Sequence, residues 1–423
     1  MAVDLTAWAE DDELGPSLVN TLAAGMEGSA ILTVAGHVRR LLAEGRTITN
    51  LTIGDFDPRQ FPIPDRLRDA IVTELEAGQT NYPPATGLPE LRKAIRGMVH
   101  RRLGLGYPER CILVGAGARP PIHAAFATIV EPGEVVVYPV PSWNTRYYVH
   151  LCGGVGRVIE TRPEDGFLPT LADVEPHLGD ARMLVLNSPV NPSGTVIGER
   201  QLREIALAIA DENHRRRRAK RRPLVLLYDQ VYWQLTFGGR VHHTPVGLVP
   251  ELAATTLLVD AISKSWAATG LRVGWAVGPA AMIDAMGTYV GHMGAWAPRA
   301  EQRAVARLLD EDHAMDGWMT AFRSAIERRL ARLSAGLREL EGEGLPVTCI
   351  EPQGAIYLSA RLDLGCGDEL LRARLLDEAG VGVVPFSAFG YPEGTGWVRL
   401  SVGAVTEADC DRAIERLGAL LRR

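Results

Sequence analysis

The sequence has few cysteines, and none of them stands in a recognisable structural pattern. Five occur among the 423 residues, at positions 111, 152, 349, 366 and 410. Their number is odd, they are scattered, and no Cys-x-x-Cys pair occurs, so we expect neither a disulfide framework nor a zinc site, and no other metal site. Free thiols of this kind are typical of proteins in a reducing compartment.

The sequence also lacks the features of an exported or membrane-bound protein. It has no stretch of eighteen apolar residues, which a membrane-spanning helix would need. Its first residues, Met1 to Glu13, are acidic, whereas a signal peptide begins with basic residues. The formal net charge of −6 gives no reason to expect nucleic acid or a membrane as a partner. We therefore expect a cytoplasmic enzyme that acts on small molecules.

One segment, His214 to Arg222, departs from this composition because it is strongly basic. It follows a helical pattern over Gln201 to Asn213 and precedes an apolar run. We predict that it covers a solvated helix end, where positive side chains complement the helix dipole. A patch for nucleic acid is the weaker alternative.

Short apolar runs alternate with helical patterns along the chain, which predicts an α/β fold with a mostly parallel sheet flanked by helices. Strands are expected at 111–114, 134–138, 183–187, 224–228 and 256–261. From about Pro298 the pattern changes to long amphipathic helices, Ala300 to Leu309 and Trp318 to Leu340.

The length of 423 residues, with 46% hydrophobic side chains, is enough for two domains. We predict a large domain over residues 65–297 and a smaller α+β domain built from both ends of the chain. Residues 1–64 would form an N-terminal arm and part of the small domain. Residues 298–423 would supply a bridging helix and the rest of it.

Several polar residues in the large domain point to one kind of chemistry. Lys264 follows the strand-like run Thr255 to Ala261 and stands eight residues before Arg272, while Asp229 ends an earlier apolar run. A lysine amine can condense with the aldehyde of pyridoxal phosphate and later carry protons. The cofactor's ring draws electrons from a bound amino acid only while its nitrogen stays protonated, which requires a carboxylate such as Asp229. An ion pair at about 4 Å is worth roughly 4 kcal/mol at an effective dielectric near 20, or about three pKa units.

The rest of the cofactor calls for further donors, and the sequence offers them. Tyr232 and Asn191 can donate hydrogen bonds to the phenolic oxygen of the ring, and the fork of Arg272 suits the phosphate. Each residue alone has an ordinary structural explanation: Asp229 could cap a helix, and Asn191 begins an Asn-Pro-Ser-Gly turn. Their combination favours the cofactor site.

The segment Gly115-Ala-Gly117-Ala-Arg119-Pro120 raises a competing hypothesis, because it nearly spells the dinucleotide fingerprint. The third glycine is missing, and no acidic residue ends a strand about 20 residues further on, as that fingerprint requires. Pro120 suits a first helical turn, whose free amides bind phosphate whatever molecule carries it. The segment therefore indicates a phosphate site, and a Rossmann dehydrogenase is the weaker interpretation.

Taken together, these motifs resemble the class I/II aminotransferases of the aspartate aminotransferase-like fold family, which depend on pyridoxal 5'-phosphate. The resemblance covers nearly the whole chain. It is carried, in this order, by Gly45 to Asp57, Asn81 to Arg92, Gly115 to Arg119, Pro139 to Trp143, the Asn191 and Asp229 motifs, Lys264 with Arg272, and Trp397 to Ser401.

The resemblance implies a role for each matching residue around the cofactor. Lys264 would bond to it covalently, Asp229 would bind the ring nitrogen, Tyr232 and Asn191 would hold the ring oxygen, and Trp143 would stack on the ring. The phosphate would be bound by Arg272, with Ala118, Arg119 and Ser263. Here the chain departs from the family, because many members have a phosphate-binding serine where this sequence has Ala261.

The resemblance also implies a substrate site and an assembly. Arg399 would clamp the substrate α-carboxylate, with Asn191 and the backbone of Gly54 beside it. Tyr82 would reach the phosphate of the neighbouring subunit's cofactor, so a homodimer is expected. Arg119 matches a lysine that contacts the distal carboxylate of the substrate in a similar bacterial subgroup, which would favour dicarboxylates. Alternatively, Arg119 is a second ligand of the phosphate or a surface arginine of the helix.

We therefore predict an aminotransferase that moves an amino group from an amino acid to a 2-oxo acid in a ping-pong cycle, with amino acids and 2-oxo acids as its small-molecule partners. The same residues could serve a C-S lyase, a cyclopropane-forming synthase or an amine-oxidising relative, because these reactions differ in which bond at Cα breaks. A ligand-sensing module of a DNA-binding regulator is a further alternative, and no helix-turn-helix pattern precedes residue 30.

Overall fold

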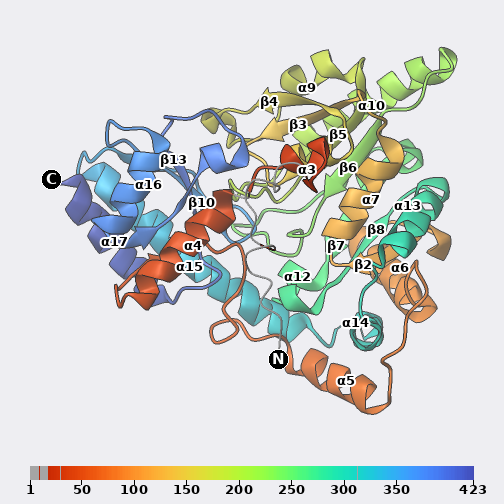
Figure 1. Cartoon of the computed structure of the whole chain (residues 1–423), viewed down its shortest axis with the longest axis horizontal. Coiled ribbons are helices and arrows are strands. Elements are labelled where there is room, and N and C mark those ends of the chain that lie inside the picture. Colours follow the sequence, from red (N-terminus) through yellow and green to blue (C-terminus); the bar gives the residue numbers. More distant parts are fainter. Residues whose placement is uncertain (1–8, 10–17, 29, 312) are drawn as a thin grey trace.

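The computed structural model describes residues 9, 18–28, 30–311 and 313–423. Most of the acidic start of the chain, on which the prediction about export rests, lies outside these residues. Within them the chain forms a large sheet covered by helices and a second, smaller layered unit that contains both N-terminal and C-terminal segments (Figure 1).

The large sheet has seven strands in the order β2-β8-β7-β6-β5-β3-β4. Their bounds are β2 Ile112–Ala116, β3 Val135–Val140, β4 Val155–Glu160, β5 Ala181–Asn187, β6 Val225–Asp229, β7 Thr256–Ala261 and β8 Val273–Val277. All neighbours are parallel except β8, which is antiparallel to both β2 and β7. The predicted α/β fold with a largely parallel sheet is confirmed, and the five predicted strands are all present. Sequence reasoning missed β4 and β8.

Both faces of this sheet are buried, which explains its uninterrupted apolar strands. Successive residues of β6 alternate between two cores: Val225 and Leu227 belong to one, and Leu226 and Tyr228 to the other. The helices that supply apolar side chains to the Val225 core include α7 Arg119–Ile129 and α13 Ala280–Met293. Those that supply the Leu226 core include α6 Pro89–Leu103, α10 Glu199–Arg218 and α14 Arg299–Asp310.

The smaller unit is built on a four-stranded antiparallel sheet in the order β12-β13-β10-β9. Its strands are β9 Val347–Cys349, β10 Tyr357–Leu362, β12 Val384–Pro385 and β13 Trp397–Ser401. The helices that accompany it in the chain are α15 Asp316–Gly342, α16 Asp368–Asp377 and α17 Glu407–Leu421.

An N-terminal segment completes this smaller unit. In it, α4 (Ala30–Ala43) packs through Val38 and Leu41 against α16, and β1 (Thr49–Asn50) pairs in parallel with β11 (Val381–Gly382). Residues more than 300 positions apart thus share one layer. The domain boundaries at residues 64 and 297 stay a prediction.

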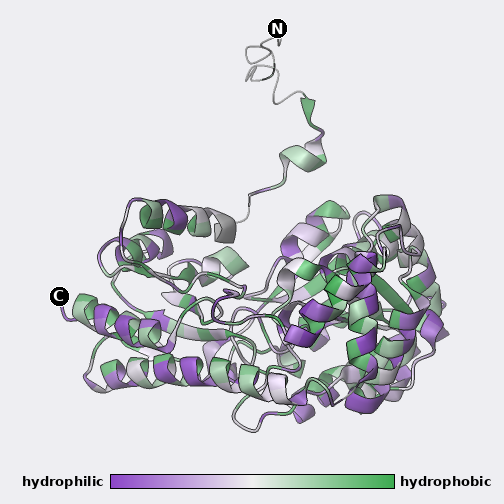
Figure 2. Ribbon diagram, turned by 90° about the horizontal axis from the view of Figure 1, so that it is seen from below, coloured by the Kyte–Doolittle hydropathy of each residue, from purple (hydrophilic) through white to green (hydrophobic). Residues whose placement is uncertain are grey.

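The remaining elements are short and connect these layers. They are α3 Thr21–Ala24, α5 Asp65–Glu76, α8 Thr145–Leu151, α9 Leu171–Leu178, α11 Pro245–Leu248, α12 Ile262–Ser265, and the 3-10 turns η1 Glu109–Cys111, η2 Pro163–Asp165, η3 Pro250–Ala254, η4 Thr269–Leu271 and η5 Phe386–Phe389. Hydrophilic and hydrophobic residues alternate along the helices (Figure 2). Of the helices described, none is both long and apolar enough to cross a membrane.

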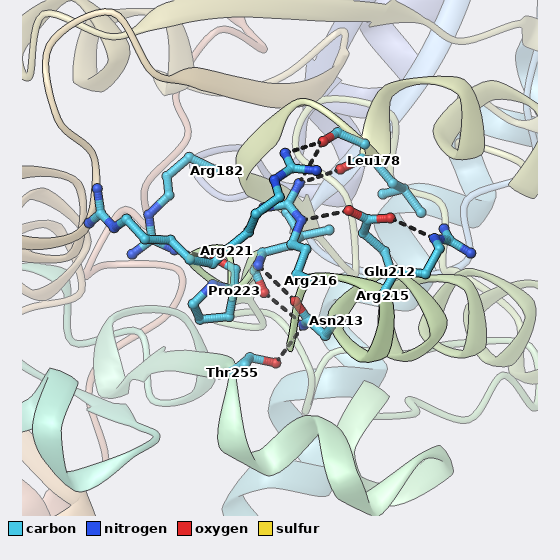
Figure 3. A network of polar contacts seen from close by, with 12 residues as sticks. Leu178, Arg182, Glu212, Asn213, Arg215, Arg216, Arg221, Pro223 and Thr255 are labelled. Carbon is cyan, nitrogen blue, oxygen red and sulfur yellow. Dashed lines mark hydrogen bonds and ion pairs between the residues drawn. The ribbon is translucent and has the colours of Figure 1, made fainter. Parts of the chain in front are cut away.

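The basic run differs from its prediction. Helix α10 extends through Arg218, so positive side chains do fill its last turns. However, Arg216 is not solvated: only 4% of it is exposed, and its Nη2 donates to the carbonyl oxygens of Leu178 (2.7 Å) and Gly179 (3.1 Å). Its Nε donates to Glu212, which is equally buried, at 2.6 Å (Figure 3). Part of the run therefore joins α10 to the end of α9, where carbonyls would otherwise lack donors.

This buried pair gives a prediction about stability. Replacing Glu212 with alanine leaves the Arg216 guanidinium buried without its carboxylate, which costs about 3 kcal/mol of unfolding free energy. The control is Glu204→Ala on the same helix, whose exposed pair with Arg200 has a separation of 3.9 Å; loss of such a pair costs about 0.5 kcal/mol or less. Urea unfolding of both variants measures the difference. Equal losses would contradict the role of the pair.

Candidate active site

A cavity of about 650 Å³ opens at the carboxyl ends of β5, β6 and β7, which is where ligands bind in open α/β sheets. Residues from the smaller unit, among them Gly54, Tyr357 and Arg399, close its other side. The predicted site residues that line it are Gly54, Ala118, Arg119, Trp143, Asn191, Asp229, Tyr232, Ser263, Lys264, Arg272 and Arg399. Of the predicted set, Tyr82 alone does not line it.

Lys264 lies on α12, a single helical turn that directly follows β7. Its Nζ donates a 2.6 Å hydrogen bond to the carbonyl oxygen of Gly54 and lies 5.9 Å from the ring centroid of Tyr232. Burial lowers the pKa of this amine to about 8; Asp55 opposes the shift, and the nearby Arg399 adds to it. About one tenth of the amine is therefore unprotonated at pH 7, far more than for an exposed lysine, and this form is the one that a nucleophile or proton acceptor requires.

Asp229 is the last residue of β6, beside Asn187 at the end of β5. The Asn187 side chain bridges the two strands, because its Nδ2 donates to the Asp229 carbonyl oxygen (2.8 Å) and its Oδ1 accepts from the Asn191 N–H (2.8 Å). Burial raises the pKa of the Asp229 carboxyl to about 6. The hydrogen bond from the Val231 N–H and the charge of Lys264 oppose this rise. Among the residues described, no cation forms an ion pair with this carboxylate, so it can receive a positively charged group of a ligand.

Arg399 lies on β13 with 1% of its surface exposed. Its Nη1 donates to Asn191 Oδ1 at 3.0 Å and its Nη2 to the Thr52 carbonyl oxygen at 2.6 Å. Its Nε is buried and has no hydrogen-bond partner within the described chain. A buried donor of this kind is costly unless it is satisfied, so Arg399 is suited to bind an anionic ligand that enters the cavity.

Arg272 is held against the glycine turn that precedes α7. Its backbone is left-handed, with φ of 56°, and its Nη1 and Nη2 donate to the carbonyl oxygens of Thr269 (2.6 Å) and Ala116 (2.9 Å). A Cβ on Gly117 would overlap the guanidinium. Because position 117 is a glycine, the Arg272 guanidinium can lie against the turn. The turn and the guanidinium together form a site for an anion.

Arg119 begins α7 and lies over Trp143, with its guanidinium carbon 4.3 Å from the ring centroid. This is a cation-π contact, and it holds an otherwise exposed arginine at the cavity wall. Tyr82 differs: 81% of it is exposed, and its ring meets that of Trp296 edge-on at 5.4 Å. Tyr82 does not line the cavity that holds the other predicted residues.

Sequence reasoning missed several residues of the cavity wall. Asp55 lies within the Gly45 to Asp57 motif, and its carboxylate accepts a 2.6 Å hydrogen bond from the Thr269 hydroxyl. Tyr357, whose hydroxyl lies 2.7 Å from that of Tyr232, lies in no motif that was singled out. Arg39 of α4 also lines the cavity, and only the fold brings this N-terminal helix there.

The cavity wall is strongly cationic. Its positive side chains are Arg39, Arg119, Lys264, Arg272 and Arg399, and its carboxylates are Asp55 and Asp229. Such an excess of like charge in a partly buried site favours anionic ligands. Separate cations for more than one anionic group are available.

Comparison with known proteins identifies the family. Residues 46–417 match the family model for aminotransferases of class I and II. The chain belongs to this family. An aspartate aminotransferase from Geobacillus stearothermophilus is 30% identical to this chain over 407 residues, covering 93% of this chain and 96% of that protein. An aspartate/prephenate aminotransferase from Thermus thermophilus is 32% identical, covering 94% and 97%.

Solved structures of aminotransferases agree with this membership. The aspartate aminotransferase from Thermus thermophilus with maleate superposes with a TM-score of 0.86 at 29% identity, covering 95% of this chain and 99% of that one. An aromatic aminotransferase from Pyrococcus horikoshii gives a TM-score of 0.81 at 27% identity, covering 91% and 98%. The protein is thus an aminotransferase of amino acids with the fold of these relatives, as predicted.

The lowered pKa of Lys264 can be measured, because the aminotransferase has few lysines. Lys93 and Lys220 are its other lysines, and both are exposed. In a K93R/K220R variant without added ligand, an amine-directed reagent should label Lys264 with a rate that rises through pH 8, since only the unprotonated amine reacts. An exposed lysine titrates near about 10.4. Peptide mapping separates Lys264 from the chain's α-amino group, and a midpoint near that of an exposed lysine would contradict the burial argument.

Proposed function

We propose that this aminotransferase uses pyridoxal 5'-phosphate to move the amino group of an acidic amino acid to a 2-oxo acid. The observation that carries the proposal is that Lys264 and Asp229 open into one cavity without pairing with each other. One is an amine with a pKa brought down to about 8, and the other is a carboxyl without a cationic partner among the described residues.

The chemistry of the donor set fits each part of this cofactor. Asp229 can hold the ring nitrogen in its protonated form, and Arg272 on the glycine turn can hold the phosphate, with Ser263 and Ala118 beside it. Tyr232 and Asn191 can donate to the ring oxygen, and the face of Trp143 can support the ring. When bound, pyridoxal phosphate supplies an electrophilic carbon and a ring that accepts the electron pair of a substrate Cα–H bond.

Lys264 is proposed to move the proton in this reaction. Its Nζ is positioned by the Gly54 carbonyl oxygen, and its pKa near 8 allows it both to accept and to return a proton at neutral pH. Arg399 is proposed to bind the substrate α-carboxylate, since its Nε is an unsatisfied buried donor and Asn191 fixes the orientation of its fork. Burial of both groups excludes water and strengthens these charge interactions.

The preference for an acidic substrate rests on Arg119. Once Arg272 and Arg399 are assigned to the phosphate and the α-carboxylate, Arg39 and Arg119 remain on the cavity wall, and Arg119 is the one held there by Trp143. A guanidinium there can form charge-assisted bonds with a second carboxylate. The names of the relatives, with aspartate as substrate, are in line with this preference.

A homodimer and a cytoplasmic location complete the proposal. Tyr82 supports the dimer, because an aromatic side chain that is 81% exposed is suited to an interface, where its hydroxyl could reach the phosphate in a second copy. The scattered cysteines are all free in the described structure, as is usual in a reducing compartment.

The covalent role of Lys264 predicts a single site of labelling. Protein loaded with pyridoxal phosphate and reduced with borohydride should carry the cofactor on the peptide that contains Lys264, as found by peptide mapping. The K93R/K220R variant should be labelled equally, and Lys264→Ala should take up cofactor without covalent retention and lose turnover. A label on any other residue, or turnover by Lys264→Ala, would overturn the assignment.

Arg119 predicts a change of substrate preference. Arg119→Ala should lower kcat/KM for aspartate by about ten- to a hundredfold, the value of a lost hydrogen bond to a charged group, and that for alanine much less. Arg119→Lys should restore part of the loss because it keeps the charge. Arg157→Ala, which removes an arginine outside the cavity, is the control. Equal losses for aspartate and alanine would show that Arg119 does not read the distal carboxylate.

A further inference from the structure

Tyr357 lies in the cavity wall between two groups to which the proposed function assigns different ligands. It begins β10 and is fully buried, and its hydroxyl oxygen lies 2.7 Å from that of Tyr232. Its ring lies under Arg399, with the guanidinium carbon 4.5 Å from the ring centroid. One side chain thus contacts both Tyr232, one of the two proposed donors to the cofactor's ring oxygen, and the proposed carboxylate clamp.

The backbone leaves Tyr357 little freedom to move. On the sheet it pairs with Ser401, which makes Arg399 its diagonal neighbour on β13, close enough for a long side chain to reach. A Cβ on Gly54 would lie 3.0 Å from the Tyr357 hydroxyl, and a Cβ on Gly194, whose φ is 73°, would overlap the Tyr357 carbonyl oxygen. Two glycines therefore allow the chain to close tightly around this residue.

The direction of the hydrogen bond follows from the proposed role of Tyr232. Burial raises the pKa of both hydroxyls, and the Arg399 cation opposes this rise in both. If Tyr232 donates its hydrogen to the ring oxygen, the hydrogen of the 2.7 Å bond between the two hydroxyls comes from Tyr357. Each hydroxyl has only one hydrogen, and this arrangement leaves the hydrogen of Tyr232 free to point into the cavity.

We propose that Tyr357 is a positioning residue that holds the Tyr232 hydroxyl as a donor toward the ring oxygen of the cofactor and makes this donation depend on whether Arg399 is occupied. The inference rests on the proposed function. A substrate carboxylate on Arg399 neutralises the cation above the Tyr357 ring, which weakens donation from Tyr357 and, through it, donation from Tyr232. Binding at the carboxylate site thereby affects the ring oxygen through Tyr357 and Tyr232, in addition to the link through Asn191, which bonds to Arg399.

The test is an absorbance titration of the protein loaded with pyridoxal phosphate, with and without succinate, a dicarboxylate that has no amino group to transfer. A donor to the ring oxygen favours the form in which the linking Lys264 nitrogen has lost its proton. Tyr357→Phe should therefore raise the titration midpoint by about half a pH unit, the size of a weakened hydrogen bond. Succinate should raise the wild-type midpoint, and raise that of Tyr357→Phe less.

Two further variants separate this role from a structural one. Tyr232→Phe should raise the midpoint at least as much, and the double variant no further than Tyr232→Phe alone, since the effect of Tyr357 acts through Tyr232. Tyr107→Phe is the matched control, because its buried hydroxyl has no partner in the described chain and lies outside the cavity; it should titrate like the wild type.

The outcomes distinguish this proposal from the proposed function. The role of Tyr357 would be overturned, and the proposed function left intact, by either of two results. One is that Tyr357→Phe and Tyr232→Phe shift the midpoint additively in the double variant. The other is that Tyr357→Phe has the midpoint and the succinate response of the wild type. If Tyr357→Phe does not fold, Tyr232→Phe decides, because it should show a smaller succinate response than the wild type; an unchanged response overturns the proposal. A wild type that takes up no pyridoxal phosphate overturns the proposed function, and this inference with it.

Discussion

The site depends on two opposite charges that are buried in one cavity and kept apart. Lys264 and Asp229 would each be stabilised by a partner ion, but Lys264 bonds to a backbone carbonyl and Asp229 to a backbone N–H. Burial therefore moves their pKa values toward each other, to about 8 and about 6. An amine and a carboxylate that each lack a partner ion are what a site for a group with an aldehyde and a basic ring nitrogen requires.

This separation is maintained because the cavity is formed by two units of the fold. Strand ends of the large sheet supply Asp229 and Lys264, while the N-terminal segment and β13 supply Gly54, Asp55 and Arg399. Hydrogen bonds join the two sides: Lys264 to Gly54, Thr269 to Asp55 and Arg399 to Asn191. Movement of one unit against the other would change all three bonds together, so access to the cavity and its electrostatics are coupled.

The buried ion pair outside the site differs, because both of its charges are satisfied. Arg216 and Glu212 form a pair and Arg216 also binds carbonyls at the end of α9. Such a pair holds elements in register. The contrast with the unsatisfied Arg399 Nε and the unpaired Asp229 distinguishes a structural polar cluster from one prepared for a ligand.

The sequence by itself determined the family, the α/β fold, five strands of the large sheet and eleven residues of the cavity wall, because each lies at a strand end or in a motif with fixed local spacing. The roles of these residues stay proposals. Only the tertiary structure decided which residues from distant segments join them. Tyr357 and Arg39 carry no local signal, the apolar run of β8 does not reveal its antiparallel direction, and Arg216 looks like any solvated arginine in a basic run. Their environments arise when separate segments pack together, from about 40 residues apart for Arg216 and Leu178 to more than 300 for Arg39, and no pattern within one segment records that contact.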